Sequence, residues 1–237
     1  MLKRVARGVG SYVSSAPGTY IWLAILLVTT EILRHADPHA EQWILERRST
    51  NIHYLTQDPL RVLVQSALWI DGSSWLFYVA LYTIFHAQAE RWLGTARWLA
   101  VAFVCHVVAT YVSEGVLALA IRNDLAPEWK RFTLDYGVSY ALAGVVAVLA
   151  YWWPNGWMRW VYAGAVLLFY GVAMVRGRTF TDVGHFTATV VGLGCRPIVR
   201  GRVSPMAWGF RWRALVGPAA GRAARRPAGW VGGWPRV

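Results

Sequence analysis

The chain has 237 residues, of which 56% are hydrophobic and only 15% are charged. This composition is too apolar for an ordinary soluble domain and predicts an integral membrane protein. The formal net charge of +12 is concentrated after residue 195, and the sequence contains no phosphate-binding loop or dinucleotide-binding turn, which excludes the common soluble nucleotide-dependent enzymes.

Six apolar segments with few charges precede residue 196 and are expected to be transmembrane helices. The first and last are short for a span of about 20 residues, so we expect each to extend by a turn into its flanks. The predicted fold class is all-α, a polytopic membrane protein whose six-helix membrane domain covers residues 19–195. The segments are residues 19–33, 73–89, 98–121, 134–153, 157–175 and 180–195.

Basic residues beside these segments predict the orientation of the chain. No small-residue cleavage signature follows the first segment, so it is expected to be a retained helix rather than a signal peptide. The positive-inside rule places residues 1–18 and the C-terminus in the cytoplasm, which predicts a multi-pass protein of the cell membrane. The basic residues that carry this prediction, besides those after the sixth segment, are Lys3, Arg4, Arg7, Arg91 and Arg97.

The first connection, residues 34–72, is too long for a plain loop and is expected on the extracytoplasmic side. Within it, residues 60–70 mix apolar side chains with Arg61 and Gln65. This pattern is typical of a helix that lies at the membrane interface.

The last part of the chain, residues 196–237, holds nine arginines and no acidic residue, with tryptophans between them. Directly after a membrane segment, this pattern predicts contact with anionic lipid headgroups at the cytoplasmic face, and nucleic acid is not expected as a partner. The high content of glycine, proline and alanine predicts a poorly ordered tail.

Neither a cofactor nor a metal site is predicted. Cys105 and Cys195 lie in apolar segments and belong to no spaced set of ligands, so neither a disulfide framework nor a zinc site is supported. Most histidines are expected to be solvated loop residues or structural residues of helices. These are His35, His39, His53, His86 and His106.

Ser139 and His185 are polar side chains near the starts of two apolar segments, a placement that suggests a functional role. Ser139 follows Asp135 by four positions and His185 follows Asp182 by three, so both are expected about one turn below the outer surface. A shared depth permits a pair in which Ser139 is the nucleophile and His185 its base.

Small residues repeat every four positions beside His185 and allow another helix to approach closely. The fourth segment carries a comparable set, which would bring Ser139 Oγ within reach of an imidazole nitrogen. The spacing leaves two alternatives open, because small residues pack in any membrane bundle and a serine also bonds a carbonyl one turn back in its own helix. The two sets are Gly184, Ala188 and Gly192, and Gly137, Ala141 and Gly144.

At these residues the chain resembles the rhomboid intramembrane serine proteases, and especially the rhomboid-like proteins common in actinobacteria. The resemblance covers about residues 20–195. Gly137-Val138-Ser139 stands at the family's Gly-x-Ser-Gly site, and Gly184-His185 with Ala188 and Gly192 stands at its Ala-His-x-x-Gly-x-x-x-Gly site. Further similarity lies in Pro59-Leu60-Arg61 and in Glu90-Arg91-Trp92-Leu93-Gly94.

The resemblance implies a six-helix fold in which Ser139 attacks a peptide carbonyl while His185 takes and returns the proton. It also implies transmembrane protein substrates, a dyad without a third carboxylate, and no cofactor. Gly137 belongs to the motif that supports the oxyanion site. Nothing in the resemblance predicts an oligomeric state.

Three positions depart from the family pattern. Many active members carry a His and an Asn that stabilise the oxyanion, and counting back from Glu90 these places hold Ser74 and Tyr78, whose hydroxyls are candidate substitutes. Tyr140 stands where the family has glycine and either shapes the substrate pocket or blocks it. The alternative function is therefore a catalytically inactive rhomboid-like protein that binds transmembrane client helices. A transporter is less favoured, because the acidic residues cluster toward the segment ends.

Overall fold

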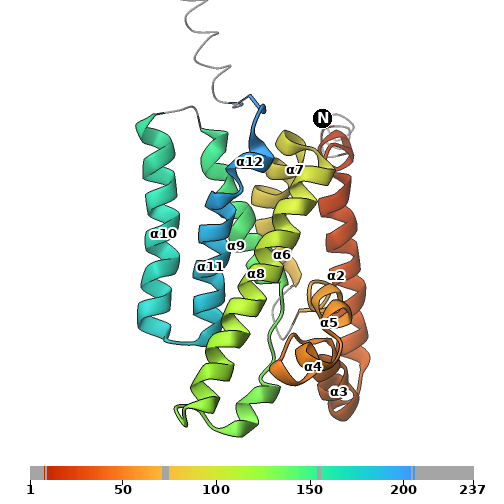
Figure 1. Ribbon diagram of the computed structural model, residues 1–237. Helices are drawn as coiled ribbons and strands as arrows, with labels where there is room; N and C mark the ends of the chain where they lie inside the picture. The colour runs from red at the N-terminus through yellow and green to blue at the C-terminus, as the bar shows by residue number, and fades with distance from the viewer. Residues whose placement is uncertain (1–7, 9, 71–74, 154–155, 204, 206–237) are drawn as a thin grey trace, which may run out of the picture.

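The computed structural model describes residues 8, 10–70, 75–153, 156–203 and 205, and most of them are helical. The predicted all-α class is confirmed, since no strand occurs in these ranges. The long helices stand side by side, and three short ones gather at one end of the bundle (Figure 1). The helices are α2 (Pro17–His35), α3 (Pro38–Arg48), α4 (Ile52–Gln57), α5 (Pro59–Ser66), α6 (Trp75–Leu81), a π-helical turn (Tyr82–His86), α7 (Ala87–Leu93), α8 (Thr95–Arg122), a 3-10 turn (Glu128–Phe132), α9 (Val138–Val148), a 3-10 turn (Leu149–Trp152), α10 (Trp157–Gly177), α11 (Phe180–Gly194) and α12 (Arg196–Val199).

The start of α2 is held by a carboxylate from another helix. Glu90 on α7 accepts hydrogen bonds from the backbone N–H groups of Gly18 (2.9 Å) and Thr19 (2.7 Å), which no carbonyl of α2 satisfies. The hydroxyl of Thr95, at the start of α8, donates to the same carboxylate at 2.7 Å. Glu90 therefore joins the first turns of α2 and α8 at one end of the bundle.

The first connection folds into the three short helices α3, α4 and α5. Each begins at a residue with a short polar side chain, Asp37, Asn51 or Asp58, whose oxygen accepts a hydrogen bond from a backbone N–H of its own helix. Helix α5 falls mostly within the predicted residues 60–70, so the helix itself is confirmed. Its placement at a membrane interface stays a prediction.

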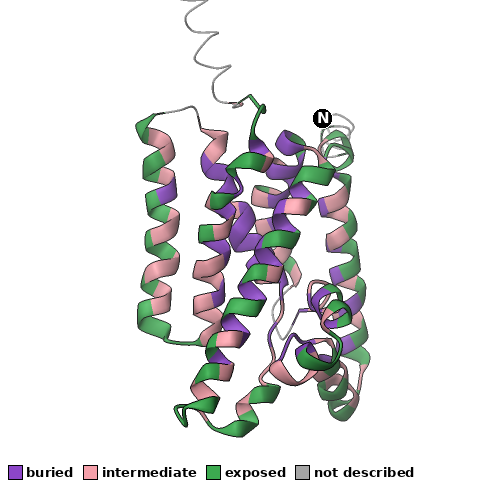
Figure 2. Ribbon diagram, viewed as in Figure 1, coloured by how far each residue is buried: buried purple, intermediate pink, exposed green. Residues whose placement is uncertain are grey.

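Helix α9 lies in the middle of the bundle, and nine of its 11 residues are buried (Figure 2). Its packing depends on glycines that leave no room for a side chain. A Cβ atom on Gly192 of α11 would overlap the carbonyl of Gly144, and one on Gly144 would overlap Cys105 of α8. Helices α8, α9 and α11 therefore form a closely packed core through the small residues of the fourth and sixth predicted segments.

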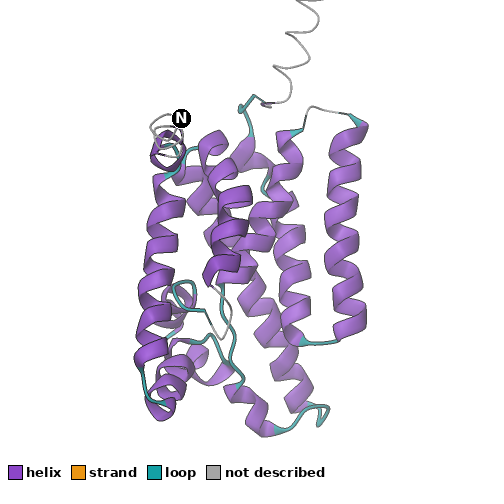
Figure 3. Ribbon diagram, turned by 180° about the vertical axis from the view of Figure 1, so that it is seen from behind, coloured by secondary structure: helices purple, strands orange, loops and turns teal. Residues whose placement is uncertain are grey.

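Helix α10 stands at the edge of the bundle in both ribbon views (Figures 1 and 3). All 21 of its residues are described, and Ala163 alone among them is buried. Helices α8 and α10 are long and apolar enough to cross a membrane, and the shorter Val138–Trp152 is also apolar. The predicted count of six spans, and the domain boundaries drawn from it, stay predictions.

The first residues of the predicted tail lie across the corner between α7 and α8. One guanidinium nitrogen of Arg202 donates to the carbonyl of Leu93 at 2.6 Å, and Trp92 Nε1 donates to the carbonyl of Val203 at 3.1 Å. Gly94 makes this corner possible with a φ of +84°, a conformation that glycine adopts without strain. The predicted disorder of the remaining tail falls on residues outside the described ranges, as do residues 1–7.

Candidate active site

Ser139 lies in the first turn of α9, half-buried on the wall of a cavity. Its hydroxyl donates a hydrogen bond of 3.4 Å to the carbonyl of Tyr136, which is the local bond that competes with any partner across the cavity. The backbone N–H of Ser139 is among the first four of α9, so no carbonyl of that helix accepts it. Ser139 therefore lines the cavity at the start of a helix, where its backbone N–H has no acceptor within α9.

The start of α9 lies inside the protein and not at its surface. Asp135 is only 4% exposed and does not mark an outer surface. Its backbone N–H donates to Ser49 Oγ at 2.7 Å, and its carbonyl accepts from the N–H of Thr50 at 2.9 Å. Ser49 and Thr50 of the first connection thus satisfy the backbone groups of Asp135. Because of these bonds, a non-helical segment can lie inside the protein before α9 begins. The prediction that Asp135 marks an outer surface was wrong, and the depth of Ser139 in the membrane stays a prediction.

His185 lies in the second turn of α11, which begins with a capping box. Thr179 Oγ1 accepts from the N–H of Asp182, and the Asp182 carboxylate accepts from the N–H of Thr179, both at 3.2 Å. The imidazole contacts two tyrosine rings, Tyr140 edge-on with centroids 5.0 Å apart and Tyr170 nearly parallel at 6.0 Å. The ring also has a hydrogen bond with the backbone of Thr181, so two tyrosine rings and a backbone group restrict the orientation of the imidazole.

Ser139 and His185 line the same cavity, which has a volume of about 560 Å³. Within the described ranges no hydrogen bond joins their side chains, and the hydroxyl of Ser139 stays with its own helix. The structure thus brings the two residues to one cavity without the direct bond that a dyad uses. The rest of the lining is mostly apolar or aromatic and consists of Phe77, Tyr78, Leu81, Phe85, Leu142, Val146, Tyr162, Ala165, Val166, Phe169, Tyr170, Ala173 and Asp182.

Tyr140, the residue after Ser139, does not line this cavity. It is fully buried, and its hydroxyl donates to Asp135 Oδ1 at 2.9 Å. Its ring occupies the space left by Gly184, where any side chain would overlap it. Tyr140 therefore does not fill the cavity beside Ser139. Its ring packs against His185, and its hydroxyl bonds Asp135.

A buried group of polar side chains surrounds the hydroxyl of Tyr140. It includes Ser113, whose Oγ accepts from Tyr140 at 3.4 Å, and Thr50, whose Oγ1 donates to Asp135 Oδ2 at 3.3 Å. Glu114 on α8 is 3% exposed, and neither of its carboxylate oxygens has a hydrogen-bond partner in the described part of the chain. The structure therefore buries both acidic residues, Asp135 and Glu114.

Gly137 directly precedes α9 and packs against an imidazole of α8. A Cβ at this position would overlap the ring of His106. His106 in turn bonds the carbonyl of Leu63 through Nε2 at 2.9 Å, and the N–H of Gly137 donates to the carbonyl of Ser66 at 3.2 Å. Gly137 therefore allows the start of α9 to dock on α8 and α5, and its part in an oxyanion site stays a prediction.

Of the two candidate oxyanion residues of the second segment, only Tyr78 can be placed. It lines the cavity together with Ser139, and its ring meets Tyr82 edge-on with centroids 6.1 Å apart. Ser74 lies outside the described residues. A role of either hydroxyl in oxyanion stabilisation stays a prediction.

The other histidines and the cysteines are placed away from this cavity. His86 stacks on Tyr82 with ring centroids 3.9 Å apart and accepts a hydrogen bond of 3.1 Å from Trp98 Nε1. Cys105 and Cys195 are buried and free. No group of three or more His, Cys, Asp or Glu side chains suited to a metal ion occurs within the described ranges.

The contact of Tyr170 with His185 was not predicted from the sequence. A tyrosine inside an apolar segment indicates a specific contact, because its hydroxyl needs a hydrogen-bond partner. The signal does not say which neighbour the ring meets, and Tyr170 reaches His185 only because α10 lies against α11. Glu114 carried the same kind of signal, as an ionisable residue inside an apolar segment.

A family model described as Rhomboid-like protein matches residues 11–205 of the chain. The matched range holds all of the helices α2 to α12 together with Ser139 and His185. No curated protein and no solved structure shows a significant match.

Proposed function

The chain belongs to the rhomboid-like protein family of membrane proteins, and on that premise we propose that it is an intramembrane serine endopeptidase that cleaves transmembrane protein substrates. The observation that carries the proposal is the single cavity on which both Ser139 and His185 lie. Its apolar and aromatic lining suits a segment drawn from a membrane helix, and its volume of about 560 Å³ suits several side chains.

In the proposed reaction Ser139 Oγ leaves its bond to Tyr136, turns toward His185 and attacks the scissile carbonyl. His185 takes the hydroxyl proton and passes it to the leaving amine, which completes the acyl-enzyme. Water then attacks the ester, with His185 again as the base, and Ser139 is regenerated. The contacts with Tyr140 and Tyr170 support the imidazole in the role that a carboxylate has in a triad.

The oxyanion of each tetrahedral intermediate needs hydrogen-bond donors that are already in position. The backbone N–H of Ser139 is one, because it lies at the start of α9 and beside the attacking oxygen. The hydroxyl of Tyr78 is a second candidate on the same cavity wall. We include Ser74 and Gly137 only as the motif positions that the family resemblance supplies.

The proposal also includes the location of the chain. We place it as a multi-pass protein of the cell membrane with both termini in the cytoplasm. The end of the bundle that carries α12 is then the cytoplasmic end, and α3, α4 and α5 lie at the extracytoplasmic end (Figure 1). Residues 1–18, 19–195 and 196–237 are the N-terminal segment, the membrane domain and the tail.

The second candidate function is the binding of transmembrane client helices in the same cavity without cleavage. The bond of the Ser139 hydroxyl to Tyr136, in place of His185, favours it. A client binder does not need the hydroxyl, so Ser139→Ala would retain binding. Filling the cavity with Ala165→Trp would abolish binding in either case, because Ala165 lines it.

The deciding experiment is covalent labelling of the detergent-solubilised chain with a fluorophosphonate probe. We expect the native protein to label, Ser139→Ala to lose the label, and His185→Ala to label about 100-fold more slowly, since a general base contributes about that factor or more. The matched control is Ser14→Ala, which removes an exposed hydroxyl shortly before α2 that does not line the cavity. We expect it to keep the native labelling rate.

Thermal unfolding of each variant shows that it is folded. Absence of label on folded native protein, under conditions that label an active family member, would overturn the protease proposal. A client pulled down by native protein and by Ser139→Ala, and lost with Ala165→Trp, would then establish the binding function.

A further inference from the structure

Two carbonyl groups at the end of α5 accept hydrogen bonds from distant parts of the chain. The last four carbonyls of a helix have no partner within that helix. In α5 the carbonyl of Leu63 accepts from Nε2 of His106 on α8 at 2.9 Å, and the carbonyl of Ser66 accepts from the N–H of Gly137 at 3.2 Å. Gly137 stands two residues before Ser139. The end of α5 therefore joins α8 to the start of the helix that carries Ser139.

His106 is held in one orientation by bonds at both ring nitrogens. A carbonyl only accepts, so Nε2 carries the hydrogen that is donated to Leu63, and Nδ1 accepts from the hydroxyl of Thr110 at 3.4 Å. The residue is 2% exposed, and its ring lies in the space that a Cβ at Gly137 would need. His106 thus contacts the residue before α9 directly and also holds the turn of α5 to which that residue is bonded.

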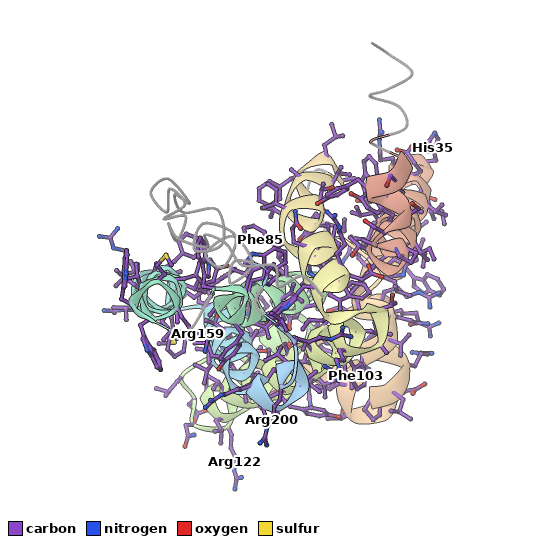
Figure 4. All side chains as sticks on the ribbon, turned by 90° about the horizontal axis from the view of Figure 1, so that it is seen from above. His35, Phe85, Phe103, Arg122, Arg159 and Arg200 are labelled. Carbon is purple, nitrogen blue, oxygen red and sulfur yellow. The ribbon has the colours of Figure 1, made fainter. Side chains whose placement is uncertain are left out.

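His106 does not line the cavity of Ser139 and His185. Figure 4 looks along the bundle and labels Phe85, which lines that cavity, and Phe103, which precedes His106 by three positions on α8. The two phenylalanines lie apart in this view. A role of His106 in the reaction must therefore act through the backbone at the start of α9.

The position of the Ser139 backbone N–H depends on where α9 begins. Helix α9 begins at Val138, directly after Gly137, and the N–H of Ser139 is the proposed oxyanion donor. Such donors act because they are already in place, and a misplacement of about 1 Å near a reacting group costs about 100-fold in rate. A side chain that fixes Gly137 therefore affects the reaction at Ser139.

We propose that His106 is a positioning residue for the reaction of Ser139. It holds α5 and Gly137 in the arrangement that sets the start of α9, and with it the direction of the Ser139 N–H. This role rests on the proposed function, because its effect is expressed through Ser139. Labelling of the native chain tests the proposed function, and the comparison of variants tests the role of His106.

The test variants are His106→Leu and His106→Gln. Leucine keeps the site apolar and loses the bond to Leu63, whereas the amide N–H of glutamine reaches the same carbonyl. Labelling with the fluorophosphonate probe over a range of concentrations separates the maximal rate from the half-saturating concentration. We expect His106→Leu to reduce the maximal rate at least about tenfold with little change in the half-saturating concentration, and His106→Gln to restore it to within about threefold of native.

The matched control is Thr29→Val, which loses a comparable bond next to the end of α5 on the side of α2. Thr29 is buried, and its hydroxyl donates to the carbonyl of Leu68, two residues after α5, at 2.9 Å. Valine has the same shape without the hydroxyl, so His106 and Gly137 keep their contacts. We expect a lower unfolding midpoint and the native maximal rate of labelling.

Hydrogen exchange in a peptide that contains residues 136–139 is a second measurement, and it needs no reaction at Ser139. We expect faster exchange in His106→Leu, because the N–H of Gly137 loses a fixed acceptor, and native exchange in His106→Gln and Thr29→Val. If His106→Leu does not fold, Thr110→Val takes its place. It removes the bond to Nδ1 alone and is expected to lower the maximal rate about threefold.

Native labelling and native exchange in folded His106→Leu would overturn the role of His106. An equal loss of rate in Thr29→Val would also overturn it, since a general loosening of the fold would then explain both variants. A loss that glutamine does not restore would show that the bond to Leu63 is not the cause. If the native chain does not label, the proposed function fails, and hydrogen exchange alone decides whether His106 fixes the start of α9.

Discussion

Helices α9 and α10 follow one another in the chain and both contribute to the cavity of Ser139 and His185, yet they are packed in opposite ways. Helix α9 buries nine of its 11 residues, whereas α10 buries one of 21. Both are apolar, so composition does not explain the difference. The explanation lies in the glycines of α9 and α11, which let those helices approach to backbone contact. Ser139 thus lies on a closely packed wall of the cavity, and the opposite wall, formed by α10, is peripheral.

The largest expected effect is on the packed side, at the glycine contact. In Gly192→Ala the new methyl overlaps the carbonyl of Gly144, and because a backbone carbonyl cannot rotate away, we expect a loss of about 3 kcal/mol of unfolding free energy. Gly164→Ala on α10 meets nothing within 4 Å and is expected to be neutral or to stabilise by less than about 1 kcal/mol. Unfolding in increasing denaturing detergent measures both, and equal losses would contradict the contrast between the two walls.

The next effect concerns the ring behind His185. Tyr140→Phe removes a hydrogen bond to the buried carboxylate of Asp135, so we expect a loss of about 2 kcal/mol of stability. The phenylalanine ring still contacts His185, so probe labelling of Ser139 is expected to stay within about threefold of native, while Tyr140→Ala is expected to reduce it at least about tenfold.

The matched control for Tyr140→Phe is Tyr162→Phe on α10. Its hydroxyl bonds the carbonyl of Val146 at 2.9 Å from a half-buried position, and its loss is expected to cost about 1 kcal/mol. Native labelling by a folded Tyr140→Ala variant would show that Tyr140 does not position the imidazole.

A smaller effect of the opposite sign is expected at Glu114. Neither of its oxygens has a hydrogen-bond partner in the described part of the chain, so Glu114→Gln loses no bond and removes a buried acidic group. We expect the variant to be more stable by about 1 kcal/mol, since an uncompensated buried acid is costly. Glu128→Gln, at an exposed carboxylate, is expected to be neutral. A clear loss of stability in Glu114→Gln would mean that the carboxylate has a partner that the protein side chains do not provide.

The smallest effect is expected on the outer face of α10. Val161 is 58% accessible, and Val161→Ala is expected to change the unfolding free energy by less than about 0.5 kcal/mol. A loss as large as that of the fully buried Val145→Ala would show that this face is packed in the membrane, against another chain or against a bound lipid. The same denaturing-detergent titration compares the two variants.

The helices were largely predictable from the sequence because apolar segments and polar caps are local signals. The segment at residues 98–121 corresponds to α8, and the interfacial segment at 60–70 overlaps α5. The family motifs likewise led to Ser139 and His185, which the structure brings to one cavity. These signals need only the residues within a few turns of one another.

The features of the site that the sequence did not predict depend on contacts between segments that are distant in the chain. Asp135 reads as a surface marker in the sequence, and only its bonds to Ser49 and Thr50, from another part of the chain, explain why it is buried. The orientation of the Tyr140 ring could not be predicted for the same reason, because Gly184 on the distant helix α11 leaves the space that this ring occupies. Spacing within one segment carries no information on which neighbour supplies the partner.

The bonds between the first connection and the residues before α9 have a consequence for how the chain assembles. Ser49 and Asp135 are 86 positions apart, so this contact closes a long loop and is expected to form late. Until it forms, the backbone N–H and carbonyl of Asp135, four residues before Ser139, lack these partners, and the position at which α9 begins is not fixed. Maturation of the site is therefore expected to wait for the docking of a segment that contributes no side chain to the cavity.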